Sequence, residues 1–73
     1  MEKNNILQIF SKNMKRLRQN ARITQEELSF RSGLHKNYIS DAERGKRNIS
    51  LKAIEKLARG LEINLTEFFM ENN

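Results

Sequence analysis

The chain contains no cysteine, no proline and a single histidine, and its three glycines all follow residue 32. Without cysteine it can form no disulfide, no thiolate metal site and no cysteine nucleophile. One histidine leaves little material for a multi-histidine metal site or a Ser-His catalytic pair. The nine carboxylates fall in no glycine-rich, histidine-paired or metal-spaced arrangement. We therefore expect a protein that is not an enzyme and that uses no cofactor and no metal.

Long hydrophobic runs are also missing. No apolar stretch approaches the roughly 20 residues that span a bilayer, and the N-terminus lacks the apolar core of a signal peptide. We expect no membrane contact and a cytoplasmic location. Residues 1–73 are enough for one domain with one core. Because a core of this size supplies only about 3–5 kcal/mol of stability, a partner subunit would help.

The charges are unevenly distributed along the chain, whose net charge is +5. Residues 12–22 contain five basic residues and no acidic one, and a second basic group is formed by Arg44, Lys46 and Arg47. After Gly60 the only charges are glutamates. A basic body with an acidic, apolar tail favours a partner such as DNA on one side of the molecule. For a basic patch alone, a solvated charged surface is the alternative.

The pattern of apolar residues predicts an all-α protein, a compact bundle of five helices. No alternating β-branched run indicates a strand. The first helix is expected over residues 5–20, with these side chains inward: Ile6, Phe10, Met14 and Leu17. The fourth should follow Ser50 as N-cap and bury these: Leu51, Ile54, Leu57, Ala58 and Leu61. A fifth, short helix should begin after Asn64 as N-cap.

Between Thr24 and Gly45 the sequence predicts two short helices joined by a tight turn. Thr24 is a suitable N-cap, and Glu27 completes the capping-box pattern S/T-x-x-E. Gly33 can take the positive φ that the turn requires, and Gly45 ends the second helix. A bracing helix followed by one that presents polar side chains is typical of a helix-turn-helix, here over about residues 24–44. The pattern indicates a reader of the DNA major groove.

The second helix of this pair should contact the bases. Its N-terminal residues enter the groove first, so Lys36 and Asn37 are the main candidates. Lysine can donate to guanine, and asparagine can pair with adenine through two hydrogen bonds. Ser40 and Asp41, one turn later, could reach flanking bases. For Asp41 two roles stay open: it accepts from a cytosine amino group, or it binds neighbouring basic side chains and orients them, which we favour.

Four segments together resemble the XRE-type helix-turn-helix family, the Cro and phage-repressor class of bacterial DNA-binding domains. They are L-R-x5-T-Q-E-E-L (17–28), G-L (33–34), I-S-x-x-E-R-G (39–45) and L-A-x-x-L (57–61). Residues 38–51, Y-I-S-D-A-E-R-G-K-R-N-I-S-L, are most similar to the controller proteins of restriction–modification systems. The resemblance implies a lambda-repressor-like fold and a sequence-specific transcription regulator.

The resemblance also implies roles for individual residues. Arg18 and Glu43 would form a buried ion pair between the first helix and the reading helix, the alternative being two surface charges. The candidates for contacts to the DNA backbone are Thr24, Gln25, His35, Tyr38, Arg44, Lys46, Arg47 and Asn48. The family implies this role for four of them: Gln25, Arg44, Arg47 and Asn48.

Three backbone candidates have rival roles that the sequence leaves open. His35 occupies the N-cap of the reading helix, where it caps poorly and could point toward a phosphate. Tyr38 could reach a phosphate or a thymine methyl group, or pack on the flank of its helix. Asn48 could instead stabilise the turn before Ser50.

The C-terminal region, about residues 61–70, is more apolar than a short last helix requires. We predict a homodimer interface formed by Ile63, Leu65, Phe68 and Phe69. A two-fold dimer would place two reading helices about 34 Å apart on a palindromic site. In the alternative, Leu65 and Phe68 close the core of the single chain and Phe69 is incidental.

The sequence is compatible with two classes of function. A homodimeric regulator would repress by covering promoter elements, or activate by touching RNA polymerase, on the nucleoid in the bacterial cytoplasm. The alternative is an antitoxin-like or phage-like repressor whose main partner is another protein. Such proteins usually carry extra partner-binding segments, whereas here only residues 1–8 and 70–73 are expected outside the bundle.

Overall fold

The computed structural model describes residues 5–71 of the chain. Within this range it contains four α-helices and one 3₁₀-helix and no strand: α1 (Ile6–Asn20), α2 (Gln25–Ser32), α3 (Lys36–Glu43), α4 (Leu51–Leu61) and η1 (Leu65–Phe69). The predicted all-α class is confirmed. None of these helices is both long and apolar enough to cross a membrane. Of the two segments expected outside the bundle, residues 1–8 and 70–73, residues 1–4 and 72–73 fall outside the described range, and residues 6–8 belong to α1.

The prediction of a fifth α-helix is wrong, because residues 65–69 form a 3₁₀-helix. Its N-cap is Asn64, as expected, and Asn64 Oδ1 accepts from Thr66 N at 3.0 Å. Glu67 N donates to Asn64 O at 3.0 Å, which is the i→i+3 bond of the tighter helix. A run of five residues is of the short length at which 3₁₀ geometry is common.

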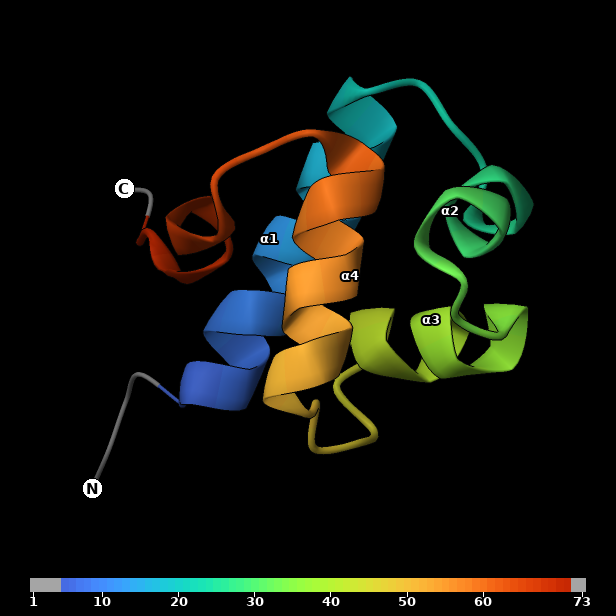
Figure 1. Ribbon diagram of the computed structural model, residues 1–73. Coiled ribbons are helices and arrows are strands. Elements are labelled where there is room, and N and C mark those ends of the chain that lie inside the picture. The colour runs from blue at the N-terminus through green and yellow to red at the C-terminus, as the bar shows by residue number, and fades with distance from the viewer. Residues whose placement is uncertain (1–4, 72–73) are drawn as a thin grey trace.

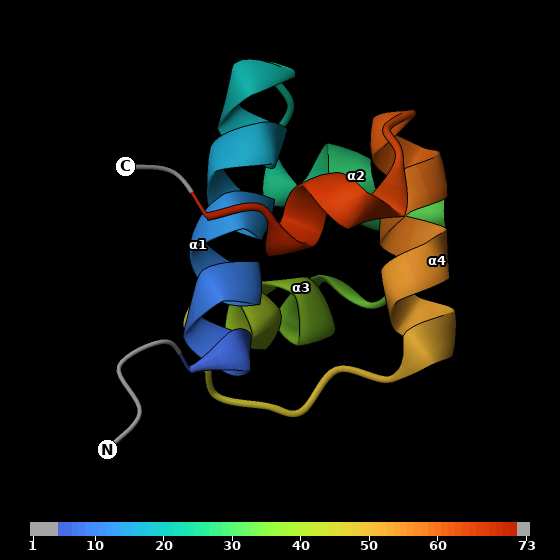
Figure 2. The ribbon, with the colours of Figure 1, turned by 90° about the vertical axis from the view of Figure 1, so that its left-hand side faces the viewer.

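The helices are arranged around α1 and α4, which overlap at the centre of Figure 1 and stand on either side of the molecule in Figure 2. Figure 2 shows η1 across the front between them and α2 with α3 behind. In this arrangement α2 packs against α3 and α4, α3 packs against α1, and η1 packs against both α1 and α4. The helix pair α2–α3 and the C-terminal segment therefore lie on opposite sides of the molecule.

Every element contributes one large, fully buried side chain to a single core. These are Met14 of α1, Leu28 of α2, Ile39 of α3, Leu57 of α4 and Phe68 of η1. Because the core needs all five elements, the orientation of α3 depends on the whole chain and not only on its own sequence.

Two side chains predicted to point inward are exposed: Ile6 is 62% exposed and Leu51 is 84% exposed. Each is the first residue of its helix, α1 or α4. The next residues of the same stripe, Phe10 and Ile54, are buried. The helical period was therefore right, but the stripe extends one turn past the elements that could cover it.

Asn13 fixes the C-terminal segment to α1, a role that the sequence did not reveal. Its buried amide nitrogen Nδ2 donates to Phe68 O at 2.8 Å and to Met70 O at 2.7 Å. The ring of Phe10 lies 5.0 Å from that of Phe68 and 5.8 Å from that of Phe69, measured between centroids. These contacts hold η1 on the side away from α3.

Candidate nucleic-acid interface

The start of α2 has the predicted N-cap but only half of the predicted capping box. Thr24 Oγ1 accepts from Glu27 N at 3.0 Å. The carboxylate of Glu27 does not return to the backbone of Thr24 and instead pairs with Arg31 one turn later, at 3.0 Å. An acidic first turn still suits the positive end of the helix.

The turn between α2 and α3 is set by a glycine and two serines. Gly33 takes the left-handed conformation with φ of 80°, and its N–H donates to Ser29 O at 2.9 Å. The hydroxyl of Ser29 donates to Leu34 O, and Ser32 Oγ accepts from Leu34 N at 3.1 Å. These bonds fix the angle at which α3 leaves α2.

His35 is a functional N-cap of α3, contrary to the expectation that it caps poorly. Its Nδ1 accepts from Asn37 N at 2.9 Å. An Nδ1 that accepts belongs to a neutral ring with the proton on Nε2. The ring therefore presents an Nε2–H donor at the N-terminal end of the reading helix.

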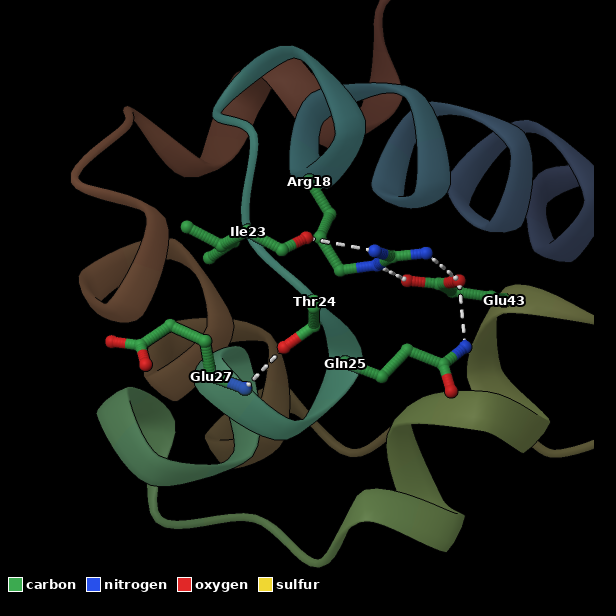
Figure 3. A network of polar contacts seen from close by, with 6 residues as sticks. All are labelled: Arg18, Ile23, Thr24, Gln25, Glu27 and Glu43. Atoms are coloured by element: carbon green, nitrogen blue, oxygen red, sulfur yellow. Dashed lines mark hydrogen bonds and ion pairs between the residues drawn. The ribbon is translucent and has the colours of Figure 1, made fainter.

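Arg18 and Glu43 form the ion pair that joins α1 to the end of α3 (Figure 3). Arg18 Nε donates to Glu43 Oε2 at 2.6 Å and Nη2 donates to Oε1 at 3.1 Å. The third nitrogen, Nη1, donates to Ile23 O at 2.8 Å. The two side chains are only 12% and 3% exposed. This fork ties the reading helix to the connection that precedes α2.

Gln25 belongs to the same network. Its Nε2 donates to Glu43 Oε1 at 3.0 Å (Figure 3). The side chain thus lies against Glu43, whereas the prediction had it directed at a phosphate. One amide hydrogen of Gln25 and the backbone at the start of α2 remain for a contact with DNA. The sequence pattern gave no signal for this internal bond, since the two residues come from different helices.

The outward face of α3 begins with Lys36, Asn37 and Ser40. Lys36 and Asn37 are exposed, and Ser40 is half-buried. Lys36 Nζ lies 3.6 Å from Glu26 Oε2, and both side chains are open to solvent. An exposed pair of this length contributes little, so the lysine can leave it for another acceptor.

Asp41 binds two arginines of the candidate backbone-contact group. Arg44 Nη2 donates to Asp41 Oδ1 at 2.9 Å, and Arg47 Nη2 lies 3.6 Å from Oδ2. Of the two roles left open for Asp41, this geometry agrees with the orientation of basic neighbours. The spacing of Tyr38, Asp41 and Arg44 by three residues places them along one side of α3.

Tyr38 packs on the flank of its helix beneath Arg47. The Arg47 guanidinium carbon lies 4.7 Å from the centre of the tyrosine ring, a cation–π contact. Tyr38 Oη accepts from Ser50 N at 3.4 Å, which ties α3 to the start of α4. The hydroxyl is therefore in use inside the chain, while the ring supports an arginine.

The segment after α3 carries the remaining candidates, Arg44, Lys46, Arg47 and Asn48, which are all exposed. Gly45 lies among them with φ of 70°, as expected of a residue that ends a helix. Within residues 5–71 no three His, Cys, Asp or Glu side chains gather closely enough to hold a metal ion. The segment offers positive charge and hydrogen-bond donors.

At the C-terminal end, Phe68 is 0% exposed and lies in the core of the single chain. It cannot contact a second chain, so its assignment to the dimer interface is corrected. Leu65 is exposed, and Ile63 and Phe69 are half-buried. Phe69 also lines an apolar groove with residues of α1, of the loop before α4 and of α4: Ile6, Leu7, Phe10, Asn48, Ile49 and Ile54.

Comparison with known proteins places these features in context. A family model described as helix-turn-helix matches residues 14–68. Control protein C.BamHI from Bacillus amyloliquefaciens is 43% identical over 61 residues, covering 82% of this chain and 75% of that protein. The crystal structure of the restriction-modification controller protein C.AhdI from Aeromonas hydrophila has a TM-score of 0.83 and 43% identity, covering 86% of this chain and 96% of that one.

A third similar protein has been solved in complex with DNA. The restriction-modification controller protein C.Esp1396I, solved as a tetramer in complex with its natural 35 base-pair operator, has a TM-score of 0.83 and 36% identity. The match covers 92% of this chain and 88% of that one.

Proposed function

This chain belongs to the helix-turn-helix family, and we propose that it is a controller protein of a restriction–modification system. In this role it regulates transcription by binding palindromic operator DNA as a homodimer. The observation that carries the proposal is the outward polar face of α3, held at a set angle by the Arg18–Glu43 fork. The likeness to an operator-bound controller protein supports it.

The contacts with DNA divide into two groups. Lys36 and Asn37, exposed at the start of α3, would read base edges in the major groove, with Ser40 beside them. The backbone would be held by the start of α2, by His35 and by the exposed segment after α3. Phosphate contacts of this kind position a domain without reading the sequence, so the two groups should respond differently to mutation.

The dimer is proposed on the side that carries η1. Ile63, Leu65 and Phe69 remain available there, and Ile6 lines the groove beside Phe69; we assign the exposed Leu51 at the start of α4 to the same interface. Because η1 and the α2–α3 pair lie on opposite sides of the molecule, such a dimer leaves α3 open to DNA (Figure 2). We treat residues 24–44 as the reading unit and residues 61–70 as the dimerisation region of one domain.

The remaining consequences follow from this function. A regulator of this kind works on the nucleoid, in the cytoplasm of a bacterium. Repression requires only that the dimer covers promoter elements, whereas activation requires a contact with RNA polymerase. We expect no catalytic activity.

Selection of binding sites from a random duplex pool at near-physiological salt tests the proposal. We expect a two-fold symmetric site with half-sites about 10 base pairs apart, bound at least about 10³-fold more tightly than random DNA. Asn37→Ala serves as the matched control, because it should fold normally and select a less defined site. If the wild-type protein enriches no sequence, the proposal is wrong, and the search moves to a protein partner of the antitoxin type.

A further inference from the structure

We propose that Asp41 increases the preference of the protein for its operator over random DNA. It holds Arg44 and Arg47 in an arrangement that meets the phosphates when α3 is bound to the operator, and its negative charge weakens other contacts with DNA. It is a positioning residue, which acts through the two arginines. The inference rests on the proposed function, since it concerns how the same DNA-binding surface separates an operator from random DNA.

Both oxygens of the Asp41 carboxylate face a guanidinium. Oδ1 accepts from Arg44 Nη2 at 2.9 Å and Oδ2 lies 3.6 Å from Arg47 Nη2. The aspartate side chain is 30% exposed, against 59% for Arg44 and 47% for Arg47. The carboxylate is thus the least exposed member of the cluster, and the arginines extend from it toward solvent.

The backbone beneath this carboxylate is also fixed. Asp41 O accepts from Arg44 N at 3.2 Å and from Lys46 N at 2.9 Å, which closes the turn after α3. Arg47 is held a second time by the ring of Tyr38, 4.7 Å away. The two arginines are therefore already placed in the protein without DNA.

Each arginine approaches Asp41 through Nη2. Their Nη1 and Nε atoms make no hydrogen bond within residues 5–71 and can donate to phosphate oxygens. When α3 is seated by its base contacts, phosphates meet these donors with no further ordering of the two long side chains. Less conformational entropy is lost on binding, as in other pre-organised interfaces.

On random DNA the same carboxylate has the opposite effect. Non-specific binding consists almost entirely of phosphate contacts made in many orientations. There the arginines must leave Asp41 to follow the phosphates, which costs the energy of one or two exposed ion pairs, and the negative charge of Asp41 is itself repelled by the phosphates. One side chain thus strengthens the specific complex and weakens the non-specific one.

The test is Asp41→Asn, measured on the selected operator and on a random duplex of equal length over a series of salt concentrations. We expect operator affinity to fall by about 3- to 10-fold, because two loosened side chains must be ordered on binding. Affinity for random DNA should rise by about 2- to 5-fold, the scale of one or two exposed ion pairs. Its salt dependence should steepen by about one phosphate contact.

Glu55→Gln is the matched control for net charge. Glu55 pairs with Arg59 at 3.6 Å on α4, so this variant loses one carboxylate and one exposed ion pair elsewhere. Glu55→Gln should change the affinities for the operator and for random DNA together, and leave the ratio between them within about 2-fold of the wild-type ratio. Asp41→Glu separates the charge of residue 41 from the position of its carboxylate. It keeps the negative charge, so affinity for random DNA should stay as low as in the wild-type protein. Because the carboxylate is moved, operator affinity should stay as low as in Asp41→Asn.

Three results would overturn the inference. A parallel rise or fall of the operator and random-DNA affinities in Asp41→Asn would show that only the charge of Asp41 matters. Selection of a different base pair by the variant would make Asp41 a direct reader. In an Arg44→Ala/Arg47→Ala background, Asp41→Asn should no longer lower operator affinity, and a persistent loss would exclude action through the arginines. Failure of the wild-type protein to prefer any operator would instead refute the proposed function itself.

Discussion

At the scale of single residues, Glu43 is the acceptor on which the DNA-reading surface depends. Three donors converge on it, two from Arg18 and one from Gln25, and they come from α1 and α2. Because its side chain is only 3% exposed, water cannot replace these donors. Glu43 therefore adds a polar tie from α3 to α1 and α2 to the packing of Ile39 and Ala42 in the common core.

We expect Glu43→Gln to lower the free energy of unfolding by about 3 kcal/mol, because it leaves the Arg18 guanidinium buried without its counter-charge. This is most of the roughly 3–5 kcal/mol available to a domain of this size. Urea unfolding followed by circular dichroism measures it. Glu55→Gln, which breaks an exposed pair, should cost less than about 1 kcal/mol.

A loss in Glu43→Gln no larger than in Glu55→Gln would show that the buried pair is not essential. The double variant Arg18→Met/Glu43→Leu gives a second check. Removing both charges leaves no unpaired buried charge, although Ile23 O and Gln25 Nε2 lose their partners, so its stability should lie closer to that of the wild-type protein than to that of Glu43→Gln.

Contacts to the bases and contacts to the DNA backbone can be distinguished by comparing substitutions at Asn37 and Arg47. Asn37→Ala should relax the preference at one base-pair position by about 1–3 kcal/mol, because a paired adenine contact is lost. Arg47→Ala should instead weaken binding to every duplex and reduce the salt dependence by about one phosphate. Competition binding against a panel of single-substitution operators measures both. A changed base preference in Arg47→Ala would contradict the division.

At the scale of elements, the C-terminus of α4 stores backbone strain. Glu62 takes the left-handed conformation, with φ of 58° and ψ of 45°, and Ile63 N donates to Ala58 O at 3.0 Å across it. Glycine is the residue that adopts this conformation without a steric cost. The helix therefore ends by a glycine-type motif that here contains a glutamate.

We expect Glu62→Gly to stabilise the protein by about 1 kcal/mol, since it removes the clash of Cβ with the backbone. For a domain of this length that corresponds to a rise in Tm of about 4–8 °C, which thermal unfolding would detect. Lys56→Gly, an exposed change in the interior of the same helix, is the control and should lower stability by about 1 kcal/mol. A lower Tm for Glu62→Gly would mean that its side chain contributes more than the strain costs.

The elements also show which features can be predicted from sequence. The N-caps Thr24, Ser50 and Asn64 and the turn at Gly33 follow the predicted pattern, because a cap depends on residues at most four positions apart. The 3₁₀ form of residues 65–69 was missed because an N-cap residue indicates where a helix begins and not whether its bonds run i→i+3 or i→i+4. Periodicity placed Leu51 on the right face of α4 and could not show that nothing in this chain covers it.

In the candidate site, too, some features could be predicted from the sequence and others could not. The exposed face of α3 and the proximity of Asp41 to Arg44 follow from helical spacing. The Arg18–Glu43 pair was suggested by family resemblance and not by spacing, and the bond from Gln25 to Glu43 was not expected at all. Contacts between different helices require their packing angles, which a single sequence does not contain.

At the scale of the whole molecule, polar and apolar surfaces are separated. The α2–α3 pair lies on one side and η1 lies on the other (Figures 1 and 2). Within residues 5–71, four of the five large apolar side chains that are exposed lie outside the α2–α3 pair: Ile6, Leu51, Leu65 and Met70. Phe30 of α2 is the exception. A second copy that covered the apolar group would add the stability that one small core lacks.

This separation predicts different effects for two equally exposed residues, Leu51 and Phe30, each 84% exposed in the single chain. Leu51→Gln should leave the fold intact and raise the dimer Kd by about 10- to 100-fold, because a buried leucine contributes about 1.5–3 kcal/mol. Phe30→Gln, on the side of α2, should leave the dimer Kd unchanged. Sedimentation equilibrium over a dilution series measures both variants. Operator binding by Leu51→Gln should then depend more steeply on protein concentration, since two chains must assemble on the DNA. Equal dimer Kd values for the two variants would place the interface elsewhere and leave the apolar surface around η1 without a partner.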